Sequence, residues 1–122
     1  MSAREEYKKA LLACRNQISE AQLKMLTAHY KADHHAITAT QLAKAARYPS
    51  FASANLHYGL LGKEIGRHLS IEPGRRSNGT PVWTTILAEG DPEKAKDEHY
   101  QWVMQPALVQ ALEELPWGMK AK

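Results

Sequence analysis

The amino-acid sequence predicts a mostly helical α+β domain of winged-helix-like type, and three features lead to this prediction. Residues 37–69 are typical of a helix-turn-helix, because two helical apolar patterns flank the break Tyr48-Pro49-Ser50. Two segments with the composition of β-strands, 82–87 and 99–104, come after it. A final helical pattern covers 105–115. We therefore expect a small antiparallel β-ribbon after a helix-turn-helix, and a C-terminal helix.

The length of 122 residues is that of one domain, and no long linker divides it. We expect a single domain over 1–122 with four regions. These are the N-terminal helices (1–36), the helix-turn-helix (37–69), the loop and β-ribbon (70–104) and the C-terminal helix (105–115).

The N-terminal region shows two helix starts of the same kind. Ser2 with Glu5, and Ser19 with Gln22, have the spacing of a capping box, in which each side chain satisfies a backbone amide of the other residue. The apolar residues that follow recur at helical spacing. The sequence therefore predicts an amphipathic helix up to about Asn16 and a second one of about 12 residues.

The helix-turn-helix begins with a third capping box, Thr38 with Gln41. After the proline, either Ser50 or Ser53 is suited to cap the second helix. Its apolar residues follow one another at steps of four, three, four and four: Ala54, Tyr58, Leu61, Ile65 and Leu69. This spacing predicts a long helix with an apolar back and a polar, cationic front.

The region after the long helix alternates between turn formers and strand formers. Residues 72–81 contain two prolines and two glycines, so we expect an exposed loop. VWTTIL (82–87) and HYQWVM (99–104) are the expected strands, with a polar tip between them and a possible short edge strand at 70–71. Pro106 suits the first turn of the last helix.

Composition restricts the classes of protein that the chain can represent. Its net charge of +3 is a mild basic excess, and one cysteine among 122 residues excludes an internal disulfide. No run of about 18 apolar residues is present, and the N-terminus is charged. We expect a cytoplasmic protein that has no contact with a membrane.

Motifs for catalysis or for cofactors are not found in the sequence. Residues 59–66 contain glycines and a lysine, but the spacing is not that of a phosphate-binding loop. His34 and His35 are adjacent, so a regular helix would point them about 100° apart, away from a common metal ion. Cys14 lies on an apolar helix face. We expect no enzyme activity, no cofactor and no metal.

Three glycines, Gly59, Gly62 and Gly66, fall along one side of the predicted long helix. Each costs up to about 1 kcal/mol of helix stability relative to alanine, so a close contact should compensate. The contact is either another helix of the domain or an external partner. Trp117, near the C-terminus, is a second candidate for a partner contact.

The run ITATQLAKAARYPSFASANLHYGLLGKEIGRHL, with the later VWTTILAEGD and QWVMQPALVQALEEL, resembles a small module that stands beside the nuclease domain of HNH-type restriction endonucleases. The most distinctive part is Asn55–Gly62. The resemblance covers residues 37–115 and implies a role in restriction or defence. Because the chain has no nuclease half, it does not imply cleavage.

Two functions of different classes remain open. The first is a non-enzymatic DNA-binding module for double-stranded DNA, in which polar side chains read bases and cationic ones bind phosphate. The residues expected to do this are Ser53, Asn55, His57, Lys63, Arg67, Arg75 and Arg76. The second is an inhibitor encoded by a phage or mobile element, of anti-CRISPR or anti-restriction type. It would bind a protein of a nucleic-acid-processing complex through the glycine face or Trp117.

Overall fold

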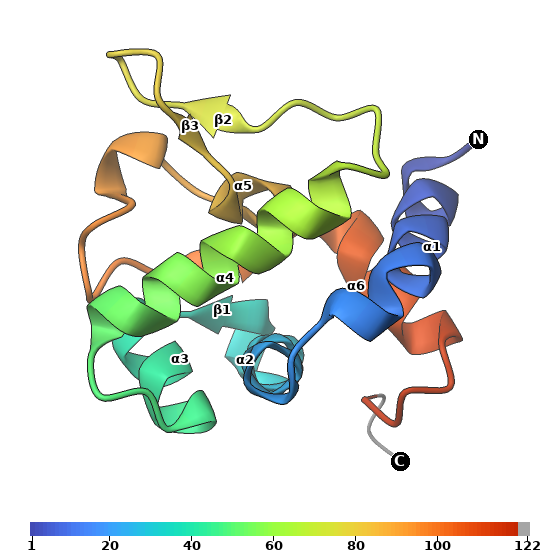
Figure 1. The fold of residues 1–122 in the computed structure, drawn as a ribbon, viewed down its shortest axis with the longest axis horizontal. Coiled ribbons are helices and arrows are strands. Elements are labelled where there is room, and N and C mark those ends of the chain that lie inside the picture. The colour runs from blue at the N-terminus through green and yellow to red at the C-terminus, as the bar shows by residue number, and fades with distance from the viewer. Residues whose placement is uncertain (120–122) are drawn as a thin grey trace.

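A computed structural model describes residues 1–119 and shows a mostly helical α+β fold (Figure 1). The α-helices are α1 (Ala3–Cys14), α2 (Glu20–Lys31), α3 (Ala39–Ala46), α4 (Phe51–Gly66), α5 (Thr84–Leu87) and α6 (Pro106–Glu114). Short 3₁₀ turns are η1 (Arg15–Gln17), η2 (Asp33–His35) and η3 (Pro92–Lys94). The strands are β1 (Ala36–Ile37), β2 (Gly74–Arg75), β3 (Pro81–Val82), β4 (Ala88–Glu89) and β5 (Trp102–Met104).

The helix starts are those that the capping patterns predicted. In each capping box the hydroxyl accepts a hydrogen bond from the backbone amide three residues on, and the Glu or Gln side chain there accepts one in return. The pairs are Ser2–Glu5, Ser19–Gln22 and Thr38–Gln41. Such an N-cap stabilises a helix by about 1 kcal/mol. Ser50, rather than Ser53, caps α4.

Helix α4 crosses the centre of the molecule, with α3, α5 and α1 packed against it (Figure 1). Its predicted apolar stripe is confirmed as far as Ile65, because Ala54, Tyr58, Leu61 and Ile65 are almost fully buried. Leu69, the last residue of the predicted stripe, lies beyond the end of α4 and is only partly buried. Between α3 and α4, Arg47 takes a left-handed conformation with φ 61°, and this residue ends α3. The α3–α4 pair therefore places one long helix with its apolar back in the core and its opposite face outward.

The segment VWTTIL does not form the expected strand. Only Val82 is in a strand, and Thr84–Leu87 form the short helix α5, which packs against α4. Ile86 and Leu87 are both fully buried, whereas an alternating strand would direct them to opposite faces. Packing of consecutive apolar residues into the core therefore overrides their β-propensity.

The β-structure is antiparallel but shorter than the sequence suggested. One sheet has the strand order β1-β5-β4, in which Ile37 pairs with Trp102 and Ala88 with Met104. Of the expected strand at 99–104, only 102–104 is one, and no strand forms at 70–71. Instead, the expected loop at 72–81 contains the β2–β3 hairpin, which protrudes beside α4 (Figure 1).

A buried histidine joins three elements of the core. His29 on α2 has no exposed surface, and its Nε2 lies 2.9 Å from the Trp102 carbonyl oxygen on β5. A carbonyl only accepts, so Nε2 carries the proton and Nδ1 accepts from the Tyr58 hydroxyl on α4 at 2.7 Å. Burial lowers the pKa of His29 to about 4. The imidazole is therefore neutral at physiological pH.

Within residues 1–119, no helix is long and apolar enough to span a bilayer.

Candidate functional site

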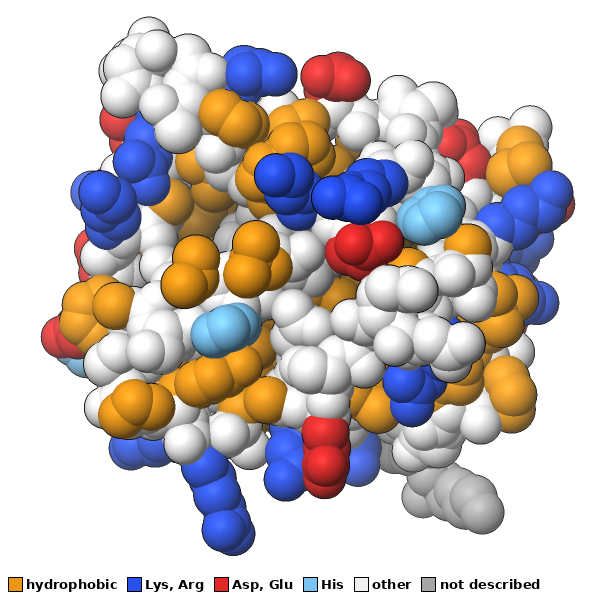
Figure 2. Space-filling view, viewed as in Figure 1, with side chains coloured by type: hydrophobic (Ala, Val, Ile, Leu, Met, Phe, Trp, Pro, Cys, Tyr) orange, Lys and Arg blue, Asp and Glu red, His pale blue; other side chains and the backbone are white. Residues whose placement is uncertain are grey.

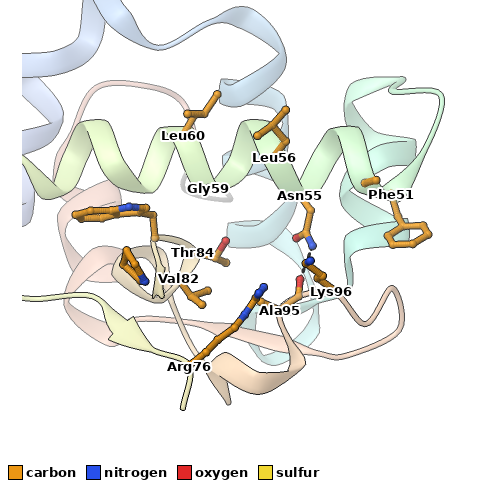
Figure 3. Close-up of a pocket in the computed structure, with 13 residues that line it drawn as sticks. Phe51, Asn55, Leu56, Gly59, Leu60, Arg76, Val82, Thr84, Ala95 and Lys96 are labelled. Carbon is orange, nitrogen blue, oxygen red and sulfur yellow. Dashed lines mark hydrogen bonds between the residues drawn. The ribbon is translucent and has the colours of Figure 1, made fainter. Parts of the chain in front are cut away.

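A groove of about 590 Å³ lies beside α4 (Figure 3). One wall is the outer part of α4, and the other is formed by the β2–β3 hairpin, the start of α5 and the segment after η3. The side chains come mainly from apolar residues. The lining consists of Phe51, Ala52, Asn55, Leu56, Gly59, Leu60, Arg76, Pro81, Val82, Trp83, Thr84, Ala95 and Lys96.

Two leucines form the exposed rim of this groove. Leu56 and Leu60 lie one turn apart on α4 and are 60% and 46% exposed. Figure 2 shows hydrophobic side chains gathered on the face that α4 presents, with Lys and Arg side chains close by. The outward face of α4 is thus apolar at its centre, where the sequence predicted a polar, cationic front.

The charged residues of the groove are both cationic. Arg76 reaches from the hairpin toward Ala95 and Lys96, as Figure 3 shows. No Asp or Glu is among the lining residues. Across residues 1–119, neither Arg76 nor Lys96 forms a salt bridge. The groove therefore combines an apolar surface with two cations that have no salt-bridge partner among the described residues.

The structure shows what the three residues predicted to read bases contact within the protein. The amide Nδ2 of Asn55 donates to the Ala95 carbonyl oxygen, which ties α4 to the segment after η3. His57 stacks on Tyr48 with ring centroids 5.0 Å apart and planes 2° from parallel. Ser53 accepts a hydrogen bond from the Ser50 hydroxyl at the start of the helix. All three side chains therefore have internal partners in the free protein, and base readout by these residues stays a prediction.

The cations predicted to contact phosphate lie at two places. Lys63 and Arg67 are exposed in the last turn of α4 and just beyond it, and Arg75 and Arg76 lie on the hairpin. Two of them have acidic neighbours: Arg67 with Glu64, and Arg75 with Glu72, each at 3.9 Å. The structure thus divides the expected phosphate-binding set into two pairs, each with one cation near an acid.

The glycine face of α4 is mainly an internal contact. A Cβ at Gly62 would overlap the Trp83 carbonyl group, whose carbon would be 2.9 Å away, and at Gly66 it would lie 3.3 Å from the Trp83 ring. These two glycines therefore allow α5 to approach α4, and they are not available to a partner. Gly59 differs, because its nearest neighbour would be the Thr84 hydroxyl at 3.8 Å, and it lines the groove.

Trp117, the other predicted partner contact, packs against the hydrophobic core. The Arg15 guanidinium lies 5.2 Å from the centre of its ring. This cation–π contact gives the indole an internal role. Trp117 is also not part of the groove.

The chemistry of the described residues suits binding. Over residues 1–119, no three His, Cys, Asp or Glu side chains are grouped to hold a metal ion. Cys14 is buried, and burial together with the nearby Glu64 raises the pKa of its thiol to about 11, so it is protonated at neutral pH. Arg76 and Lys96 are the titratable lining groups, so the groove suits an apolar or acidic ligand.

The sequence contained a signal for the groove. Ala52, Leu56 and Leu60 recur at steps of four, beside the stripe that fills the core. A helix with a second apolar stripe has more apolar surface than its own core requires. This excess, which the prediction of the site did not use, is the signal that could have indicated Leu56 and Leu60.

Comparison with known proteins found no family model, no curated protein and no solved structure that matches the chain.

Proposed function

We propose that this protein is a non-enzymatic binding module that holds a segment of a partner protein in the groove beside α4. This is the second of the two functions predicted from the sequence, with a different contact surface. Given the resemblance to modules of HNH-type endonucleases, the class of partner is a protein of a nucleic-acid-processing complex. Binding there would make the module an adaptor or an inhibitor.

The observation that carries this proposal is the exposure of Leu56 and Leu60 beside an apolar groove. Isolated exposed leucines are ordinary, but two on one helix turn at the edge of a concave apolar surface form a contiguous patch. Residues at i and i+4 are also the anchors by which helices and grooves recognise one another in protein complexes. Burial of such a side chain stabilises a complex by about 1.5–3 kcal/mol.

Duplex DNA is the second candidate, favoured by Lys63 and Arg67 at the end of α4 and by the arginines of the protruding hairpin. If all four cations contacted phosphates, log affinity would fall with log salt concentration at a slope of about −4. Because two have acidic neighbours and the helix centre is apolar, we expect no measurable binding of a fluorescent duplex at physiological salt. Binding with that slope, reduced by about one unit in Arg67→Ala, would favour DNA instead.

Leu60→Glu tests the groove directly. A library of random 12-residue peptides displayed on phage is selected against the protein, and the affinities of enriched peptides are measured by fluorescence anisotropy. Placing a carboxylate on the apolar rim should weaken binding by at least about tenfold, as truncation of a hot-spot residue does.

The matched control is Leu12→Glu, because Leu12 is 54% exposed on α1 and is not part of the groove. It should leave the affinities unchanged. Peptides that bind Leu60→Glu as well as the unmodified protein would show that the groove is not the binding site.

A further inference from the structure

Arg76 is held in place by the backbone of the hairpin. Its amide donates to the Thr80 carbonyl at 2.9 Å, and its own carbonyl accepts from the Gly79 amide at 2.8 Å. The next residue is fixed as well, because the Ser77 amide donates to the Glu93 carboxylate. The guanidinium therefore projects into the groove from a closed turn, as Figure 3 shows.

Lys96 approaches the groove from a segment that is also anchored. The carbonyl of the preceding residue, Ala95, accepts the hydrogen bond from Asn55 on α4. This bond fixes residues 95 and 96 against the helix that forms the other wall. Two like charges are thus held on the same side of one groove by separate backbone contacts (Figure 3).

Asp97 and Glu98 directly follow Lys96, but neither lines the groove or forms a salt bridge with Lys96: the Asp97 carboxylate accepts from the His99 amide, and the Glu98 carboxylate lies 3.0 Å from His99 Nε2. Glu93 accepts from the Ser77 amide in the turn of the hairpin, and Asp91 accepts from the Glu93 amide as the cap of η3. Neither carboxylate is among the residues that line the groove. A ligand carboxylate would therefore meet two cations without competition from a lining acid.

We infer that Arg76 and Lys96 determine the specificity of the groove for an acidic segment, one in which bulky apolar side chains are accompanied by one or more carboxylates. This inference rests on the proposed function and adds the charge of the partner. The apolar residues contact Leu56 and Leu60, while the carboxylate binds the two cations. An Arg–carboxylate hydrogen bond is charge-assisted, and its strength increases where apolar walls lower the local dielectric constant.

The experiment reverses the charge of both Arg76 and Lys96. The same displayed library of random 12-residue peptides is selected in parallel against the unmodified protein and against the double variant R76E/K96E. Peptides enriched on the unmodified protein should carry a net negative charge, and those enriched on the variant a net positive charge. Acidic peptides from the first selection should bind R76E/K96E at least about tenfold more weakly, since like charges then face each other.

The control K9E/K94E changes the net charge by the same amount at two exposed positions outside the groove. It should retain the preference for acidic peptides. The single variant K96E alters only an exposed residue, so it tests the inference even if the double variant unfolds. K96E should also weaken the binding of acidic peptides, by a smaller factor than R76E/K96E.

Two failures can be told apart. Suppose that the enriched peptides depend on Leu60 but carry no excess of negative charge, or that K9E/K94E removes this excess as fully as R76E/K96E does. Either result would overturn the assignment of Arg76 and Lys96 and leave the proposed function intact. If no enriched peptide depends on Leu60, the proposed function itself is wrong, and the inference fails with it.

Discussion

Gly62→Ala should lower the melting temperature by about 8 °C, which corresponds to a loss of about 2 kcal/mol. The added methyl group would overlap the Trp83 carbonyl group, so α5 must move away from α4. Overpacking against a fixed backbone costs about 3 kcal/mol, and the gain in helix propensity offsets about 1 kcal/mol of this. Thermal and urea denaturation measure the difference.

Gly59→Ala is the matched control in the same helix. A methyl group there would have only the Thr84 hydroxyl at 3.8 Å, an ordinary contact, so the protein should gain up to about 1 kcal/mol. Opposite signs for two glycines one turn apart would establish that α5 packs onto Gly62. Equal stabilisation by both substitutions would contradict the α4–α5 contact.

Acidification from pH 6.5 to 4.5 should destabilise the protein by about 2 kcal/mol through His29 alone. The pKa of this histidine is lowered to about 4 by burial, so the folded protein keeps it neutral while the unfolded chain binds a proton. The stability that comes from keeping His29 neutral is therefore present above pH 6.5 and is lost as the pH falls toward 4. Urea unfolding at several pH values measures the slope.

His29→Gln separates this effect from other acid-sensitive groups. A glutamine amide can donate to the Trp102 carbonyl and accept from Tyr58, as His29 does, but it does not titrate in this range. The variant should lose most of the dependence on pH between 6.5 and 4.5. Hydrogen bonds from Ser2 and Ser70 lower the carboxyl pKa values of Glu5 and Glu6 below 4.5. The stabilisation from these two carboxylates is therefore lost mainly below the pH range of this experiment. An unchanged slope would exclude His29 as its source.

Helix positions were predictable from the sequence because their signals are local. The capping residues Ser2, Ser19 and Thr38 act within one turn, and the core stripe of α4 follows from periodicity alone. The strands were less predictable. Thr84–Leu87 has strand composition, but a partner distant in the sequence, α4, determines that it forms a helical turn.

The groove beside α4 shares only part of its lining with the residues named from the sequence, among them Asn55, Gly59 and Arg76. Periodicity showed which side of α4 enters the core, yet it did not show that Asn55 would find the Ala95 carbonyl forty positions away. Nor did it show that the hairpin and the segment after η3 would build a second wall across the groove from α4. Side-chain partners across long sequence separations are tertiary properties, which a single sequence does not encode in a local pattern.

The groove as a binding site is tested most directly by the leucine methyl signals in NMR spectra of the intact protein, recorded while an enriched peptide is added. The methyl groups of Leu56 and Leu60 should shift in proportion to the bound fraction, and those of the equally exposed Leu12 should not. Shifts confined to Leu12, or absent from both Leu56 and Leu60 at saturation, would contradict a partner segment bound in the groove beside α4.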